Sequence, residues 1–329
     1  MLWTRPRECR SLPTVRVPDT HTARHIVDQG SHVHTERLQL VLHLEFLDSP
    51  VGRFIPKVGF WLLIAVIFFY ALFPFYWAVR SAFTPEGQLF NTPLQYFPTH
   101  PTLENFRQIF STSFFTHALI NSTIVAGAVT LLSLAIGSLA AYALGRFRFR
   151  GRSGVLYLML SMTIFPQIAI LGALYTLMKD FQLYDKLWSL IFSYLIFTLP
   201  FTVWVLTSFM RTLPADLEEA AYVDGATPLQ VFYKVLLPLI APGLVTTGLL
   251  AFISAWNEYL YAISFIQSPD KYTVPIAITS FVGKTGSAFD VPWGQIMAAT
   301  VVVTLPLIAV TLILQRRILA GLTAGAVKG

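Results

Sequence analysis

Residues 211–238 read RTLPADLEEAAYVDGATPLQVFYKVLLP, the longest polar interval between two long apolar runs in the second half of the chain. Pro214 suits the first turn of a helix, where a backbone N–H is not needed. Leu217 and Val223 are compatible with helix, and Gly225 stands where a glycine in left-handed backbone commonly ends one. The first half of the interval therefore predicts a short helix that stops at Gly225.

A second short helix is expected directly after this glycine. Thr227 and Gln230 have the Ser/Thr-x-x-Glu/Gln spacing of a capping box, and Pro228 falls in the first turn. We expect this helix to run to about Leu237 and to stop at Pro238, because proline interrupts the helical hydrogen bonds. The interval thus predicts two short helices hinged at a glycine.

On either side of this interval the chain is strongly apolar. Hydrophobic residues make up 55% of the sequence and charged residues 12%, well below the charge content of a soluble domain. A helix needs roughly 20 apolar residues to cross a bilayer. Six runs have about this length: 58–79, 118–144, 154–178, 187–209, 240–263 and 293–314. The fold class predicted is all-α, a polytopic bundle of six transmembrane helices.

The basic charge of the chain follows this topology. The net charge is +6, but arginines gather in one set of loops, above all Arg146, Arg148, Arg150 and Arg152. Such loops are cytoplasmic, so both termini and 211–238 are predicted inside. The arginine turn then lies against the anionic lipids of the inner leaflet, and no nucleic-acid partner is expected.

The two ends of the chain do not belong to the helical pattern. Residues 1–52 hold six arginines and five histidines without a sustained period, which predicts a disordered tail or an extension that does not belong to the native protein. His32 and His34 lack a third clustered ligand, and Cys9 is the only cysteine, so no metal site is predicted. The last helix is expected to end near Arg316, which leaves a cytoplasmic tail over 315–329.

Polar and aromatic residues inside the spans mark candidates for a substrate path. Glu258 is the only acidic residue within the six runs, and an intramembrane carboxylate is a functional-site hypothesis. The other reading is an interfacial carboxylate, with neighbouring aromatic residues in the membrane belt. Binding sites for small molecules combine apolar and aromatic side chains with a few polar groups. The candidates are Asn121, Gln167, Trp256, Asn257, Glu258 and Tyr259.

The interval also keeps a long-range spacing: EAA, three residues, a glycine, nine residues, then V-x-L-P. Together with six spans and the C-terminal GLTAGAVKG, this pattern resembles the EAA loop and tail of binding-protein-dependent ABC sugar importer permeases, most closely maltose/maltodextrin subunits of the MalG type. The resemblance covers about 53–329 and implies the ABC importer type I permease fold in the cell inner membrane. It also implies a second homologous permease, an ATPase dimer and an extracytoplasmic sugar-binding protein.

In that family the EAA loop is a coupling helix that lies in a cleft of the ATPase. The resemblance therefore assigns ATPase coupling to Glu219, Ala220, Ala221, Gly225, Leu237 and Pro238. Val235 stands where the family usually has isoleucine. Small alanines allow a close approach by a partner, and a glycine hinge lets two helices meet at a sharp angle.

Catalysis is not expected on this chain. Residues 145–152 lack the Lys-Ser/Thr end of a phosphate-binding loop, and no catalytic residue is predicted. ATP and magnesium are expected on the partner ATPase. The substrate implied is an oligosaccharide such as maltose, maltodextrin or trehalose.

Other classes stay open at this point. An ABC permease for a non-sugar solute, such as a glycerol phosphate or an amino acid, would have the same loop. A secondary ion-coupled transporter needs carboxylates within the spans, for which Glu258 alone is available. A membrane scaffold without a transport role leaves the 211–238 pattern unexplained.

Overall fold

The structure is a computed structural model that describes residues 50–90, 92–93, 95–282 and 291–326. The chain forms two compact units, Met1–Pro74 and Phe75–Gly329. Helix α2 (Pro50–Ala82) supplies the described part of the first unit and the start of the second. The tail predicted over 1–52 lies outside the described residues, except that positions 50–52 belong to α2.

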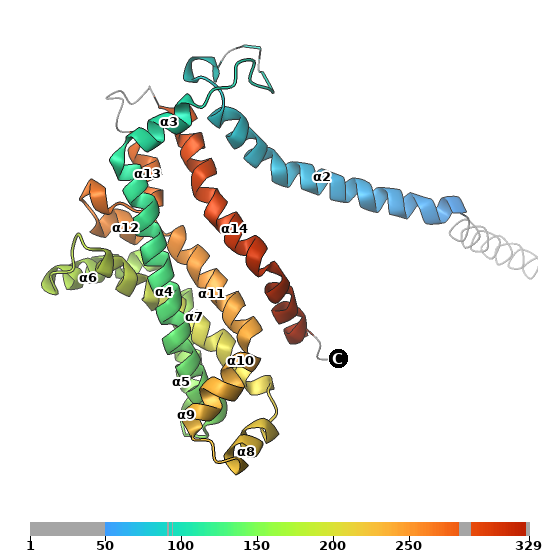
Figure 1. Ribbon diagram of the computed structural model, residues 1–329, viewed down its shortest axis with the longest axis vertical. Coiled ribbons are helices and arrows are strands. Elements are labelled where there is room, and N and C mark those ends of the chain that lie inside the picture. Colours follow the sequence, from blue (N-terminus) through green and yellow to red (C-terminus); the bar gives the residue numbers. More distant parts are fainter. Residues whose placement is uncertain (1–49, 91, 94, 283–290, 327–329) are drawn as a thin grey trace, which may run out of the picture. The chain divides into compact units, whose positions relative to one another are not determined.

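Every regular element in the described part of the chain is helical, which confirms the predicted all-α class. After α2 the elements are η1 (Glu86–Gln88), α3 (Glu104–Ser111), α4 (Ser113–Arg146), α5 (Arg152–Ile164), α6 (Gln167–Asp180), α7 (Leu187–Thr212), α8 (Asp216–Val223), α9 (Pro228–Val231), the π-helical turn η2 (Phe232–Leu236), α10 (Leu237–Leu239), α11 (Ala241–Trp256), α12 (Leu260–Phe265), η3 (Pro269–Lys271), α13 (Val274–Ser280) and α14 (Trp293–Ala326). Within the second unit, α3 and α13 lie toward one end and α8 lies at the other (Figure 1).

Among the described residues four helices are long and apolar enough to cross a membrane, and six spans result if each bent pair of helices counts as one. The four are Lys57–Ala82, Ser113–Arg146, Leu187–Thr212 and Trp293–Gln315. The bent pairs are α5 with α6, at 96°, and the α9–α10 segment with α11, at 77°.

Two of the predicted spans are interrupted in the structure. The run 154–178 was predicted as one helix, but it breaks at Phe165 and Pro166, whose backbones are extended. A residue before proline is driven away from helical backbone, which explains the break. The run 240–263 also breaks, because α11 ends at Trp256 and α12 begins only at Leu260.

The last helix also differs from its prediction. The last helix was expected to end near Arg316, whereas α14 continues to Ala326. Leucine and alanine favour helix, and the two glycines, Gly321 and Gly325, are tolerated when the helix has already begun.

Helices α4 and α7 pack against each other through small residues and hydroxyl groups. The Ser133 and Thr198 hydroxyls are hydrogen-bonded across the pair at 2.9 Å. A Cβ atom on Gly145 would lie 2.8 Å from Cβ of Met210, so glycine is needed for the helices to approach this closely. Close backbone approach and hydroxyl bonds are the usual means of holding membrane helices together.

Polar bonds fix the loops at the end of the second unit opposite α8. Asp185, in the link between α6 and α7, accepts hydrogen bonds from the backbone N–H groups of Gln267 and Ser268 and from Lys271 Nζ, at 2.9, 3.0 and 2.9 Å. Burial acts to raise the pKa of Asp185, but the bonds from Ser268, Lys271 and Gln267 outweigh it and hold the pKa well below its usual range. The loop 266–273 is therefore tied to the bundle.

Candidate functional site

The candidate site is the helical hairpin formed by α8 and the helices that follow it. Helix α8 ends in a Schellman motif: Gly225 N–H donates to the Tyr222 carbonyl and Ala226 N–H donates to the Ala221 carbonyl, both at 3.0 Å. Gly225 has φ +80°, a backbone conformation that side chains with a Cβ rarely adopt. The predicted hinge at this glycine is confirmed.

The second helix begins with the predicted capping box. Gln230 N–H donates to Thr227 Oγ1 at 3.3 Å, and Thr227 N–H donates to Gln230 Oε1 at 2.9 Å. Pro228 occupies the first turn, as predicted.

Two details of the hairpin differ from prediction. Pro214 precedes the first turn of α8, which starts at Asp216; Leu213 before the proline has extended backbone, and Ala215 after it is already helical. Pro238 does not stop the second helix. The π-helical turn of Phe232–Leu236 widens the backbone just before it, so helix continues to Leu239 and the bend falls at Ile240.

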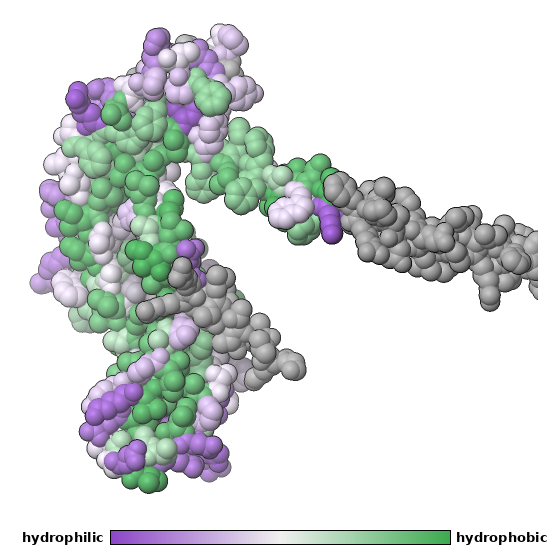
Figure 2. All heavy atoms as spheres, turned by 45° about the vertical axis from the view of Figure 1, so that its right-hand side comes forward, coloured by the Kyte–Doolittle hydropathy of each residue, from purple (hydrophilic) through white to green (hydrophobic). Residues whose placement is uncertain are grey.

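The hairpin presents a mixed surface to its surroundings. Glu219, Ala220, Gly225 and Pro238 are exposed, whereas Ala221 and Leu237 are half-buried. Large apolar side chains lie between the polar ones: Val223 is 87% exposed and Leu229 is 62% exposed. Figure 2 shows hydrophilic and hydrophobic side chains side by side at this end of the second unit. A surface of this kind is typical of a docking site for another protein.

The inner side of the hairpin is anchored on the ends of α4 and α7. Val231, Phe232 and Leu236 form one buried cluster with Ala141, Tyr142, Leu206, Met210 and Ile240, and Ala221 and Leu237 pack against it. Of the six predicted coupling residues, four therefore face outward and two help to attach the hairpin to the bundle.

An ion pair that the sequence reasoning missed joins α8 to α4. Arg146 Nε lies 2.5 Å from Glu218 Oε1, and the two side chains are only 12% and 13% exposed. Arg146 Nε and Nη2 make no hydrogen bond within the described residues, so charge attraction holds the contact. Arg146 was assigned to topology and the neighbouring Glu219 to coupling. The sequence signal was the pair of adjacent glutamates, Glu218 and Glu219. Neighbouring residues of a helix point in different directions, so one of the two was bound to lie nearer the bundle.

The predicted substrate-path residues do not form one group. Gln167, at the start of α6, lines a cavity of about 270 Å³ with side chains of α7 and α11. Trp256 is 3% exposed and stacks on Phe252 in the main apolar cluster. Asn121 donates to the carbonyls of Asp270 and Tyr272, at 2.9 and 3.0 Å, and so holds a loop.

The remaining three candidates build the break between α11 and α12. Glu258 accepts the N–H groups of Tyr261 and Ala262 at 2.9 and 3.2 Å and thereby caps α12. Asn257 donates to the Ile253 carbonyl at 2.9 Å, and Tyr259 is 38% exposed. The carboxylate thus has a structural role here, and its place at a helix break favours neither of the two readings of the sequence.

Other cavity residues were not predicted. Thr198 and Phe201 of α7 and Ser254 of α11 line it with Gln167. Thr198 was detectable because Thr198 and Thr202 lie four residues apart, on one face of α7.

Comparison with known proteins identifies the family of this chain. The model of the family described as "Binding-protein-dependent transport system inner membrane component" matches residues 133–323, more than half of the chain. The chain belongs to this family. It is therefore a transport permease component and a multi-pass membrane protein, and the match includes the whole α8–α10 hairpin.

Similar proteins of known transport systems support this family membership. The trehalose transport system permease protein SugB of Mycobacterium tuberculosis is 42% identical, over 79% of this chain and 93% of its own length. The trehalose/maltose transport system permease protein MalG of Thermococcus litoralis is 40% identical, over 82% of this chain and 94% of its own. One solved structure is similar in fold: a chain of a bacterial ABC transporter involved in the import of the acidic polysaccharide alginate. The TM-score is 0.71 and the sequence identity 21%, and the match covers 82% of this chain and 98% of that chain. This likeness supports the permease fold.

Proposed function

We propose that this binding-protein-dependent permease imports an oligosaccharide of the trehalose or maltose kind. An extracytoplasmic binding protein delivers the sugar, and a separate ATPase dimer supplies the energy with ATP and magnesium. A second homologous permease completes the two-fold arrangement that an ATPase dimer requires.

The observation that carries the proposal is the α8–α10 hairpin, which is exposed on one side and rigidly attached on the other. A force applied to Glu219, Ala220 or Val223 reaches α4 through the Glu218–Arg146 pair and α7 through the buried cluster. The hairpin therefore moves with these helices as one body. The cap at Thr227 and the Schellman motif at Gly225 keep its two arms at a defined angle.

Such a linkage suits alternating access driven by a partner. An ATPase that holds the hairpins differently in its open and closed states biases the bundle toward one of two arrangements. ATP supplies the free energy through hydrolysis on the ATPase. This chain's residues receive the motion and change which side of the membrane the path opens to.

The cavity chemistry supports a neutral, hydroxyl-rich solute. Its described lining combines the phenyl rings of Phe197 and Phe201 with the polar groups of Gln167, Thr198 and Ser254 and contains no charged side chain. Aromatic faces with hydrogen-bonding groups are what sugar rings require, whereas a phosphate would need a cation. The names of the two relatives, trehalose and trehalose/maltose transport permeases, support the same class.

The orientation proposed is N-in and C-in, with the hairpin in the cytoplasm. The four arginines at 146–152 lie beside the hairpin end of α4 and favour the cytoplasmic side by the positive-inside rule.

The test is uptake by proteoliposomes that contain this permease, its partner permease, the ATPase and the binding protein. Labelled trehalose and maltose are added outside, with ATP sealed inside. We expect uptake of one of these two sugars, and we expect this uptake to require both ATP and the binding protein. Uptake of a phosphate ester or an amino acid instead would contradict the sugar class, and uptake without ATPase would contradict the ATP-driven mechanism.

A further inference from the structure

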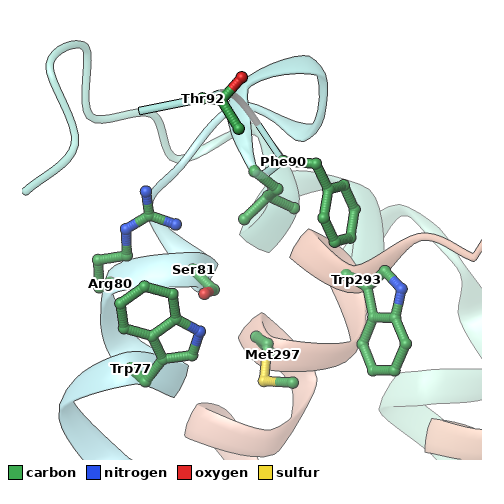
Figure 3. A pocket seen from close by; sticks show the side chains of 8 residues that line it. Trp77, Arg80, Ser81, Phe90, Thr92, Trp293 and Met297 are labelled. Carbon is green, nitrogen blue, oxygen red and sulfur yellow. The ribbon is translucent and has the colours of Figure 1, made fainter. Parts of the chain in front are cut away.

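A second pocket lies in the second unit, at the end opposite α8. Its volume is about 460 Å³, and it is lined by the end of α2, the segment after it and the start of α14. Figure 3 shows Trp77 and Arg80 on one side, Phe90 and Trp293 on the other, and Met297 at the bottom between them.

Arg80 is the unusual residue of this pocket. It is only 4% exposed, and its Nε and Nη1 atoms have no hydrogen-bond partner. None of the ion pairs in the described residues includes it. Within the described residues its guanidinium makes a cation–π contact with Trp77, whose ring centre lies 4.9 Å from the guanidinium carbon.

This arrangement is costly without a ligand. Burying a cation without a counter-charge is strongly unfavourable, and a cation–π contact offsets only part of that cost. An anion in the pocket removes the deficit. A guanidinium presents planar N–H donors that match the oxygens of a phosphate group in a bidentate manner.

The backbone around Arg80 is held in place, so the pocket is a built feature. Asn105 Nδ2 donates to the carbonyls of Ala82 and Thr84, both at 2.9 Å, and Thr84 Oγ1 donates to the Arg80 carbonyl at 2.7 Å. A Cβ atom on Gly294 would lie 2.7 Å from the Asn105 amide, so glycine lets α14 pack against it.

The rest of the pocket selects an amphiphile. The walls beside the guanidinium are mainly aromatic and aliphatic, and indole rings such as those of Trp77 and Trp293 favour the headgroup level of a bilayer. Met297 begins a stripe on α14 at helical spacing, with Leu305, Ile308 and Leu312 58%, 46% and 57% exposed. An acyl chain that leaves the pocket meets this stripe directly.

We infer that the pocket binds one phospholipid, with its phosphodiester group on Arg80 and an acyl chain along the Met297–Leu312 stripe of α14. A small free anion would make no favourable contact with the apolar walls of the pocket. The bound lipid neutralises the arginine and fastens the end of α2 to the start of α14.

The first test counts lipids on the whole importer complex, purified in mild detergent, by native mass spectrometry. Arg80→Gln should lower the tightly bound phospholipid by about one molecule for each copy of this chain. The matched control is Arg107→Gln at the same end of the bundle, where the side chain is 84% exposed, and it should leave the count unchanged. An unchanged count in Arg80→Gln overturns the inference.

Competition separates the phosphodiester from other occupants. Delipidated wild-type complex should gain thermal stability with phosphatidylglycerol or phosphatidylethanolamine, and not with diacylglycerol or inorganic phosphate. Equal stabilisation by inorganic phosphate indicates a free-anion site and overturns the lipid. Release of a partner subunit by Arg80→Gln, with an unchanged lipid count, indicates a protein carboxylate and also overturns it.

A measurement without any mutation guards against a variant that fails to fold. A phospholipid with a photoreactive group on its acyl chain is added to the wild-type complex, and the labelled peptides are identified. Labels on the segment 293–312 support the inference. Labels confined to other helices contradict it.

Discussion

The two ends of the second unit use their charged residues in opposite ways. At the α8 end the buried charge is paired within the chain, through Glu218 and Arg146, and Glu219 is left exposed. At the other end Asp185 is paired with Lys271, while no carboxylate of the described residues pairs with buried Arg80. The hairpin is thus complete in itself and offers a surface, whereas the Arg80 pocket is incomplete and offers a binding site. A protein partner suits the first, and a small ligand the second.

The largest effect is expected at Gly225, the hinge between α8 and α9. Gly225→Pro changes φ from +80° to about −65° and removes the N–H that bonds Tyr222, so the arms of the hairpin lose their angle. We expect ATP-driven uptake in proteoliposomes to be abolished. The control is Gly154→Ala, where a Cβ meets nothing within 4 Å and which should transport normally. Normal uptake by Gly225→Pro would show that the hinge does not transmit the motion.

The next largest effect is expected at the ion pair. Glu218→Gln leaves Arg146 almost buried without its counter-charge, which typically costs about 3 kcal/mol. The thermal unfolding temperature of the purified complex should fall. Exchange of the two charges, Glu218→Arg with Arg146→Glu, should restore part of the loss. If the single variant is as stable as the wild type, the pair does not anchor the hairpin.

The opposite end gives a smaller effect that depends on pH. Asp185→Asn loses charge-assisted hydrogen bonds and should lower stability by about 1–2 kcal/mol at neutral pH. The pKa of Asp185 is depressed in the folded state, so its contribution is complete above the unfolded value of about 4 and is lost as pH falls below it. The difference in unfolding temperature between variant and wild type should therefore shrink in acid. A difference that grows in acid would contradict this sign.

The smallest effect distinguishes the two adjacent glutamates. The Glu219 side chain is exposed and makes no recorded hydrogen bond or ion pair with the described residues, so Glu219→Lys should leave stability unchanged. Loss and reversal of a charge at a docking surface should weaken ATPase binding on the order of tenfold. Co-purification and a binding titration measure it, with Glu218→Gln as the contrasting variant. Stability lost in Glu219→Lys, with ATPase binding intact, would reverse the roles assigned to the two residues.

Local features of the hairpin were predictable because their causes are local. A left-handed glycine at 225 and the Thr227–Gln230 capping box depend on backbone geometry within a few residues, and both are present as predicted. The end of the second helix was not predictable in this way. Its passage through Pro238 depends on a π-helical turn that forms as Phe232 and Leu236 pack onto α4 and α7.

The site residues also divide into those that the local sequence indicates and those that depend on helix packing. Spacing alone selected Glu219, Ala220, Ala221, Gly225, Leu237 and Pro238, but which of them face outward depends on how α8 lies on the bundle. Among the substrate-path candidates, only Gln167 lines the cavity, because residues from α6, α7 and α11 meet there and no sequence period joins them.

The sequence by itself determined the helical class, the apolar runs and the hinged hairpin, since hydropathy, glycine and capping chemistry act over a few residues. Only the tertiary structure decided that Glu218, and not Glu219, pairs with Arg146, and that Arg80 is buried without an ion-pair partner among the described residues. Both facts depend on the distance between residues far apart in the chain. That distance is fixed by the packing of whole helices and not by any one segment.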